Sequence, residues 1–580
     1  MTLSIVKKKD NKYLYIVKKV RVDGKPKTVV VQKCGKLSDL EKQYDDPIQH
    51  FKDIALKMSL EEKEENSISF LTSFKREKVG SDKEILLNGG YLFLQKIYRA
   101  LRLNTLIKKI KQEYKIKYDL DKILQDLIYS RIIFPGSKRN SFEDSKCFIE
   151  KGDYELHDVY RSLTVLNEWF DKIQSFVYKS SENIVKRNKS ILYYDCTNFF
   201  FEIEYDDELR KHGISKEHRP NPLVQMGLFM DANGIPLAID INPGNTNEQI
   251  TLRPFEQKVL NDFNLSKVIV CTDAGLASYS NRVFNDSQER SFIVTQPIKK
   301  LRSHLKEWCL NRKNFTSYII DKERNKTFYK SISMKEKIAY DLEKDDELVK
   351  IKGQKEWRII VTYSEAYAEY QRTLRENQIT RAKSLINNPT RFNKTNAQDC
   401  KRFIKNIAFD KNGEIVKNRQ LIFDSSIAKV EERYDGFYAV CTNLEGKDQD
   451  IVKINKGRWE IEESFRIMKT NLKSRPVYVS LKEHIRAHFL TCFLALLFVK
   501  IIDEKLEHKY SINQIITSLR KIQYTDINVG YMTSFKTNDC ILSLIKEFDI
   551  ECDYNAYTPI QMRKLINSSL NEKFATSIKM

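Results

Sequence analysis

The chain has 580 residues, more than one hydrophobic core usually organises, so several domains are expected. Its composition, 41% hydrophobic and 31% charged, is that of a soluble globular protein. The chain contains only 12 Pro and 18 Gly, too few for long low-complexity linkers. Lys and Arg outnumber Asp and Glu by 100 to 79, a net charge of +21 that favours a polyanionic partner, either nucleic acid or an acidic membrane surface.

Residues 1–45 contain two alternating runs, K-Y-L-Y-I-V-K-K-V-R-V and K-T-V-V-V-Q-K-C-G. The alternation predicts a β-hairpin module with its turn at Asp23 and Gly24. Its many lysines either contact a phosphate backbone or protect the edge of a small sheet, and the sequence leaves both open. From about 46 to 188 the pattern becomes helical, as in D-K-I-L-Q-D-L-I-Y-S-R-I-I-F, which ends before Pro135 and Gly136.

Residues 190–300 alternate between strand-like and helix-like runs. Strands are predicted at 191–195, 224–230, 236–241, 267–272 and 291–296, and helices at 251–263 and 279–288. Asp195 and Asp273 each follow a short apolar run typical of a strand buried on both faces. Ligand sites gather at the carboxyl ends of such strands, although a single acid there is equally typical of a turn.

Residues 301–450 separate Asp273 from the next motif. W-R-I-I-V-T-Y and G-F-Y-A-V-C-T-N-L predict strands, and Ser364 begins a long helix predicted to end before Pro389. Arg372, Arg375 and Arg381 on this helix either contact DNA or form a solvated face.

The stretch Lys456 to Lys469, K-G-R-W-E-I-E-E-S-F-R-I-M-K, predicts one helix. Its apolar stripe comprises Ile454, Ile461, Phe465, Met468 and Leu472. Helical periodicity places Glu462 at the edge of the buried face between Arg458 and Lys469, and it points Glu460 and Glu463 outward. Ordinary i,i+4 ion pairs on an amphipathic helix explain this stretch equally well when it is considered alone.

The most apolar stretch, Phe489 to Val499, is about half as long as a membrane span and predicts a core helix. Lys7 to Lys9 interrupt the N-terminus before any apolar run long enough for a secretory signal. The 10 Cys include no C-x-x-C pair and suggest buried thiols of a reducing compartment, so we expect a cytoplasmic protein.

Asp195, Asp273 and Glu462 together resemble the acidic triad of DDE transposases. R-W-E-I-E-E-S-F-R-I-M-K is similar to the Y-(2)-R-(3)-E-(6)-K signature of the insertion-sequence-four branch, and its spacing matches at Arg458, Glu462 and Lys469. The signature's tyrosine falls on Asn455, which can still donate to a phosphate. Flanking segments are similar as well, over roughly residues 190–500: D-C-T-N-F-F-F-E, G-I-S-K-E-H-R-P-N-P-L, P-G-N-T-N-E and R-P-V-Y-V.

The order of elements and the resemblance both point to an α/β fold with a ribonuclease H-like core. This core is expected to be a mixed five-stranded sheet with helices, in which the first and fourth strands lie side by side and parallel. The expected domains are a β-hairpin module (1–45), a helical domain that binds DNA ends (46–188), the core (189–300 and 451–508), an inserted domain (301–450) and a C-terminal helical region (509–580).

The resemblance implies a transposase that cleaves DNA at the ends of its insertion sequence and joins 3′-hydroxyl ends to a target. Asp195, Asp273 and Glu462 would hold two Mg²⁺ ions, with Mn²⁺ as a substitute, for two-metal phosphoryl transfer. DNA phosphates would meet the side chains of Arg458, Lys469, Arg466 and Asn455. A homodimer on paired DNA ends in a bacterial nucleoid is implied too. The alternatives are a ribonuclease H-like nuclease or resolvase that does not join strands, and an inactive DNA-binding remnant.

Overall fold

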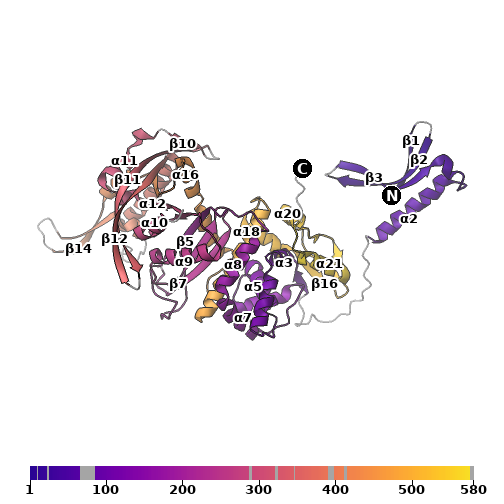
Figure 1. Cartoon of the computed structure of the whole chain (residues 1–580), viewed down its shortest axis with the longest axis horizontal. Coiled ribbons are helices and arrows are strands. Elements are labelled where there is room, and N and C mark those ends of the chain that lie inside the picture. Colours follow the sequence, from indigo (N-terminus) through magenta and orange to yellow (C-terminus); the bar gives the residue numbers. More distant parts are fainter. Residues whose placement is uncertain are drawn as a thin grey trace. The chain divides into compact units, whose positions relative to one another are not determined.

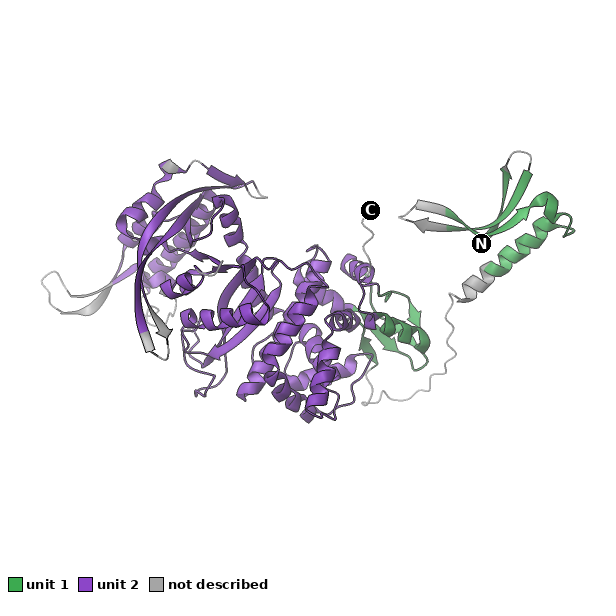
Figure 2. Ribbon diagram, in the orientation of Figure 1, with its two compact units in different colours: residues 1–89, 522–537, 550–568 green, residues 90–521, 538–549, 569–580 purple. Residues whose placement is uncertain are grey.

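The computed structural model describes eleven stretches of the chain (Figure 1). They are residues 1–8, 11–22, 25–65, 85–217, 219–286, 290–315, 317–320, 324–344, 347–388, 398–409 and 415–574. The chain divides into two compact units (Figure 2), one of residues 1–89, 522–537 and 550–568, the other of residues 90–521, 538–549 and 569–580.

The first unit contains two small antiparallel sheets. The predicted hairpin is confirmed as β2 (Asn11–Val22) and β3 (Lys25–Lys36), and its predicted turn at Asp23 and Gly24 lies outside the described residues. A third strand, β1 (Thr2–Lys8), pairs with β2, and α2 (Pro47–Glu65) follows. The second sheet has the order β18-β17-β16-β4. Its strands are β4 (Leu86–Asn88), β16 (Gln523–Asp526), β17 (Tyr531–Thr533) and β18 (Ala556–Tyr557), and the last helix of this part is α21 (Pro559–Leu570).

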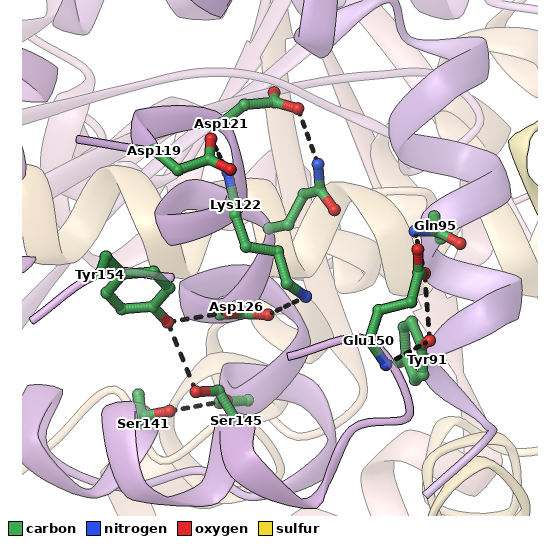
Figure 3. A network of polar contacts seen from close by, with 12 residues as sticks. Tyr91, Gln95, Asp119, Asp121, Lys122, Asp126, Ser141, Ser145, Glu150 and Tyr154 are labelled. Carbon is green, nitrogen blue, oxygen red and sulfur yellow. Dashed lines mark hydrogen bonds and ion pairs between the residues drawn. The ribbon is translucent and has the colours of Figure 1, made fainter. Parts of the chain in front are cut away.

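Helices predominate in the first part of the second unit, as the sequence predicts. They are α3 (Tyr91–Ala100), α4 (Leu103–Glu113), α5 (Leu120–Ile133), α6 (Lys138–Asp144), α7 (Leu156–Glu168) and α8 (Phe170–Ser181), with α19 (Ile512–Lys521) and α20 (Asp539–Phe548) from later in the chain. One network of polar groups here pairs a buried carboxylate (Figure 3): Asp126 accepts hydrogen bonds from Lys122 Nζ at 2.7 Å and from the Tyr154 hydroxyl at 2.8 Å. Such pairing offsets the cost of removing these charges from water.

Helix α18 (Lys482–Lys505) packs against α5 and α7. Its 24 residues are long and apolar enough to cross a membrane by length and composition, but 94% of the relevant window is buried inside the protein. The predicted core helix is thus confirmed, although the apolar stretch seen in the sequence is only part of it.

A large mixed sheet lies beside these helices, so the chain is α/β as predicted. Its strands include β5 (Ile191–Phe200), β6 (Leu223–Asp231), β7 (Pro236–Pro243), β8 (Ile269–Thr272) and β9 (Ser291–Thr295). β5 pairs in parallel with β8, and β8 with β9, whereas β6 and β7 are antiparallel to their neighbours. The expected parallel contact between the first and fourth strands is therefore confirmed.

Helices cover both faces of this sheet at β5. Tyr194 packs into a core with Phe255 of α9 (Glu248–Asp262), whereas the Tyr193 hydroxyl, on the opposite face, donates to the Ile454 carbonyl at 2.8 Å. Burial on both faces explains the continuous apolar runs that predicted these strands.

In the part of the chain that the structure describes, this sheet has nine strands, not the five expected. β10 (Ser317–Ile320), β11 (Lys326–Lys344), β12 (Glu347–Ser364) and β15 (Phe437–Thr442) extend it in the order β10-β11-β12-β15-β9. β15 pairs antiparallel with β9, with Val440 opposite Thr295, so backbone groups that would otherwise form an open edge are hydrogen-bonded. Residues 301–450 also contribute α11 (Ser303–Leu310), the predicted long helix α12 (Glu365–Asn387) and a hairpin of β13 (Ile404–Phe409) and β14 (Ile415–Phe423).

Candidate active site

The two aspartates lie near the place where β5 and β8 run side by side. The parallel pairing joins 191–193 to 269–271, and Asp273 comes directly after the end of β8. Asp195 lies two residues beyond the paired stretch but in the middle of β5, where it is still paired with Leu228 of β6. The predicted strand end at Asp195 is therefore wrong, because antiparallel pairing with β6 carries the strand on to Phe200.

The signature stretch forms two helices, not the single helix predicted. α16 (Asp448–Lys456) and α17 (Trp459–Thr470) are separated by Gly457 and Arg458. Gly457 lies against the ring of Tyr193, so that a Cβ at this position would overlap the Tyr193 hydroxyl and lie 2.9 Å from its Cζ. Close packing on β5 thus requires a glycine at the break.

Four members of the predicted apolar stripe, Ile461, Phe465, Met468 and Leu472, are buried. The fifth, Ile454, lies on α16 and is only half-buried. The predicted order of the acids is wrong. The Glu462 side chain is 68% exposed, whereas the side chains of Glu460 and Glu463 are 23% and 26% exposed.

The reason is that the buried face of α17 is wider than the apolar stripe. Ser464 and Ile467 are buried too, on the side of the helix that also carries Glu460. Glu460 accepts a hydrogen bond at 2.9 Å from Lys500 of α18, a contact that an analysis of this helix alone does not contain.

Arg458 connects the acids. One terminal nitrogen of its guanidinium lies 3.3 Å from Asp273 Oδ1, and the other lies 3.8 Å from Glu462 Oε1. The same group donates to the hydroxyls of Thr295 at 3.0 Å and Tyr438 at 3.5 Å. Its side chain is only 11% exposed, so the guanidinium is held on several sides, and both acids share one buried cation.

The charges of this region change the pKa values of its groups. The pKa of Asp195 is raised to about 6, mainly because the carboxyl is buried. The positive charges of Lys216 and Arg458 oppose this rise, and the negative charge of Asp273 adds to it. Burial alone would lower the pKa of Arg458, but Asp273 foremost, with Asp195 contributing, raises it above its usual range. The charge of Asp273 thus reaches Asp195, and both aspartates stabilise the charged form of Arg458.

The predicted DNA-binding residues differ in their surroundings. Lys469 lies in the same region and donates to Glu217 Oε1 at 3.2 Å. Arg466 is exposed and forms an ion pair with Glu463 instead. Asn455, on α16, lines a cavity of about 510 Å³ together with Tyr438 and Lys456.

Sequence reasoning assigned no role to Lys216, Glu217 or Arg475. Lys216 donates to the Cys196 carbonyl, forms an ion pair at 3.0 Å with Glu248 Oε1 and lies near Asp195. Glu217 accepts hydrogen bonds from both Lys469 and Arg475. The sequence did mark these positions, because they lie in the segments G-I-S-K-E and R-P-V-Y-V, which resemble the family.

A divalent cation fits this site in its donor chemistry. Three carboxylates are the hard oxygen ligands that Mg²⁺ and Mn²⁺ prefer, and Arg458 already holds two of them around one positive charge. Within the described residues, however, no group of three or more His, Cys, Asp or Glu side chains is close enough to hold a metal ion. The exposed Glu462 side chain would have to move toward the aspartates to complete such a group.

Comparisons with known proteins identify the family. Residues 202–498 match the transposase DDE domain, and residues 3–68 match the N-terminal domain of IS1634 family transposases. The first match spans 297 of 580 residues (498 − 202 + 1) and contains Asp273 and Glu462; Asp195 lies seven residues before it (202 − 195). The chain belongs to the DDE transposases of bacterial insertion sequences, as its motifs predict.

Other comparisons add little. A search of curated proteins finds no match. Among solved structures, the chain is similar to a piggyBac transposase in a synaptic complex with hairpin DNA, with 7% sequence identity over 74% of this chain and 78% of that chain and a TM-score of 0.35. So low a score supports no conclusion about the site.

Proposed function

We propose that this transposase cleaves DNA at the ends of its insertion sequence and joins the 3′-hydroxyl ends to target DNA, with Asp195, Asp273 and Glu462 as its catalytic carboxylates. The observation that carries the proposal is the shared contact of Arg458 with Asp273 and Glu462, at the carboxyl end of β8 and beside Asp195 of the neighbouring parallel strand β5. Ligand sites of α/β proteins gather at such strand ends.

Each residue has a role in this proposal. The carboxylates supply oxygen ligands for Mg²⁺, with Mn²⁺ as a substitute, and the bound cations would activate the attacking oxygen and stabilise the leaving oxygen. Arg458, whose guanidinium is fixed by Thr295 and Tyr438, would hold a phosphate oxygen as a preorganised fork. Lys469 would place a point charge against the same DNA strand. Arg466 and Asn455 would contact phosphates further along that DNA strand.

The architecture is consistent with a ribonuclease H-like core. The strand order β7-β6-β5-β8-β9, with β5, β8 and β9 parallel, supports this assignment. We further propose the insertion-sequence-four-like branch, a DNA-end-binding role for residues 46–188, a homodimer on paired DNA ends and a cytoplasmic, nucleoid-associated location.

A direct test neutralises two of the proposed catalytic acids, one at a time, and uses a neighbouring acid of α17 as the control. Asp195→Asn and Glu462→Gln should each lower cleavage of a plasmid carrying the gene and its native flanking DNA by at least about 10²-fold, because catalytic charge is lost. The control Glu463→Gln also removes one charge, in an ion pair with Arg466, and should retain activity. DNA binding should persist in all three variants. Equal cleavage by Asp195→Asn and the unaltered protein would contradict the proposal.

Strand joining is tested separately from cleavage. The protein is given pre-cut DNA ends with free 3′-hydroxyls and a supercoiled target plasmid, and joined products are resolved on a gel. A transposase should yield joined products. Cleavage without joining would instead support a nuclease or resolvase.

A further inference from the structure

Glu217 lies where two of the site's cations converge. Its Oε1 accepts a hydrogen bond from Lys469 at 3.2 Å, and its Oε2 accepts one from Arg475. The side chains of Lys469, Arg475 and Glu217 are 15%, 27% and 28% exposed, so the group is partly open to solvent. One carboxylate therefore neutralises two cations that a DNA strand could reach.

The two cations are held in place by the end of β5. Lys469 lies over the ring of Phe199, 5.3 Å from its centroid, and Arg475 lies over the ring of Phe200 at 5.4 Å. Arg219 lies over Phe200 too, at 5.0 Å. Cation–π contacts of this kind fix a charge on a rigid strand. Removing Glu217 would therefore leave the cations where they are.

The position of this group relative to the acids is informative. Phe199 is four residues beyond Asp195 on the same strand (199 − 195), a separation of about 13 Å. Lys216, the residue before Glu217, lies near both Asp195 and Lys469, since its charge lowers the pKa of each. A DNA strand with its scissile phosphate at Asp195 would bring a phosphate about two nucleotides away to Lys469 and Arg475.

We propose that Lys469 and Arg475 form a binding site for a backbone phosphate a short distance along the strand from the one that is cut, and that the Glu217 carboxylate occupies this site until DNA displaces it. The inference rests on the proposed function, because it assumes that DNA enters the site along β5. A carboxylate between two cations has the charge and the acceptor oxygens of a bound phosphate. The lowered pKa of Glu217, which Arg475 and Lys469 cause against the effect of burial, keeps it charged at neutral pH.

The test compares Glu217→Gln with Glu208→Gln. Both remove one negative charge, but Glu208 pairs with the exposed Lys482 and does not contact Lys469 or Arg475. Binding of a fluorescent DNA duplex of unrelated sequence is measured by anisotropy without divalent metal, from about 50 to 200 mM salt. Glu217→Gln should bind about three- to tenfold tighter than the unaltered protein, with Glu208→Gln changed less than twofold. The slope of log K against log salt should steepen by up to about 0.9, the value for one phosphate.

A double-mutant cycle locates the gain in affinity. Arg475→Gln should weaken binding by itself, and in that background Glu217→Gln should gain less than in the unaltered protein. Unchanged or weaker binding by Glu217→Gln would overturn the proposal and make Glu217 a support of its loop. Normal binding by Arg475→Gln would overturn it as well, whether or not Glu217→Gln folds normally. These results are independent of the cleavage test, since no strand is cut in the binding assay.

Discussion

The guanidinium of Arg458 contacts four polar groups of the site at once. They are the carboxylates of Asp273 and Glu462 and the hydroxyls of Thr295 and Tyr438. A lysine at this position keeps the charge but offers a single point donor on a flexible chain. Arg458→Lys should therefore lower the cleavage rate by about 10- to 100-fold with little change in DNA affinity. The control is Arg466→Lys, on the exposed side of α17, which should retain most activity. Comparable rates in the two variants would show that the fork geometry is not needed.

Residue identities at the site were predictable in part. The types and spacing of Arg458, Glu462 and Lys469 carried the family signature, and a helical wheel gave Ile461, Phe465 and Met468 of the buried face of α17 but missed Ser464 and Ile467. The wheel failed for Glu462, because the contact of Glu460 with Lys500 comes from a different helix. The periodicity of one helix cannot predict a contact with Lys500, which lies 40 residues further along the chain (500 − 460). The same limit hid Glu217, whose partners are more than 250 residues further along the chain.

At the level of elements, the break between α16 and α17 positions Arg458. Gly457 packs against Tyr193 without room for a side chain. Gly457→Ala should lower the free energy of unfolding by about 1–3 kcal/mol, the usual cost of overpacking, and should reduce cleavage because the start of α17 must shift away from β5. Urea unfolding and cleavage assays measure the two effects. Adding Tyr193→Phe removes the overlapping hydroxyl and should restore part of the loss.

The control for this variant is Gly353→Ala. A Cβ at Gly353 meets only Ile338 Cγ1 at 3.9 Å, so stability should change little. If Gly457→Ala unfolds at the same urea concentration as the control, the close packing on Tyr193 does not constrain the break. Sequence reasoning predicted a continuous helix here because the apolar stripe keeps its helical period across Gly457, and the contact with β5 is not visible in that period.

For the whole molecule, the main difference from expectation is that residues 301–450 contribute to the central sheet. Their strands were visible in the sequence as apolar β-branched runs, but a run of this kind does not specify which strand it pairs with. Long-range pairing decided the result, since β15 lies beside β9 although about 140 residues separate them. The division of the chain into a core and an inserted domain therefore remains a prediction that stability measurements can test.

Continuity of the sheet predicts that its two parts unfold together. Ile359 to Val361 of β12 and Leu192 to Tyr194 of β5 are all buried in strands of one hydrogen-bonded sheet. Hydrogen–deuterium exchange followed by mass spectrometry in increasing denaturant should give similar opening free energies for peptides from the two strands, because β15, β9 and β8 join β12 to β5 through continuous hydrogen-bonded pairing. The β13–β14 hairpin, which forms a separate two-stranded sheet, should exchange at lower denaturant and serves as an internal control. If β12 lost protection while β5 kept it, residues 301–450 would behave as an autonomous domain joined to the core only by adjacent strands.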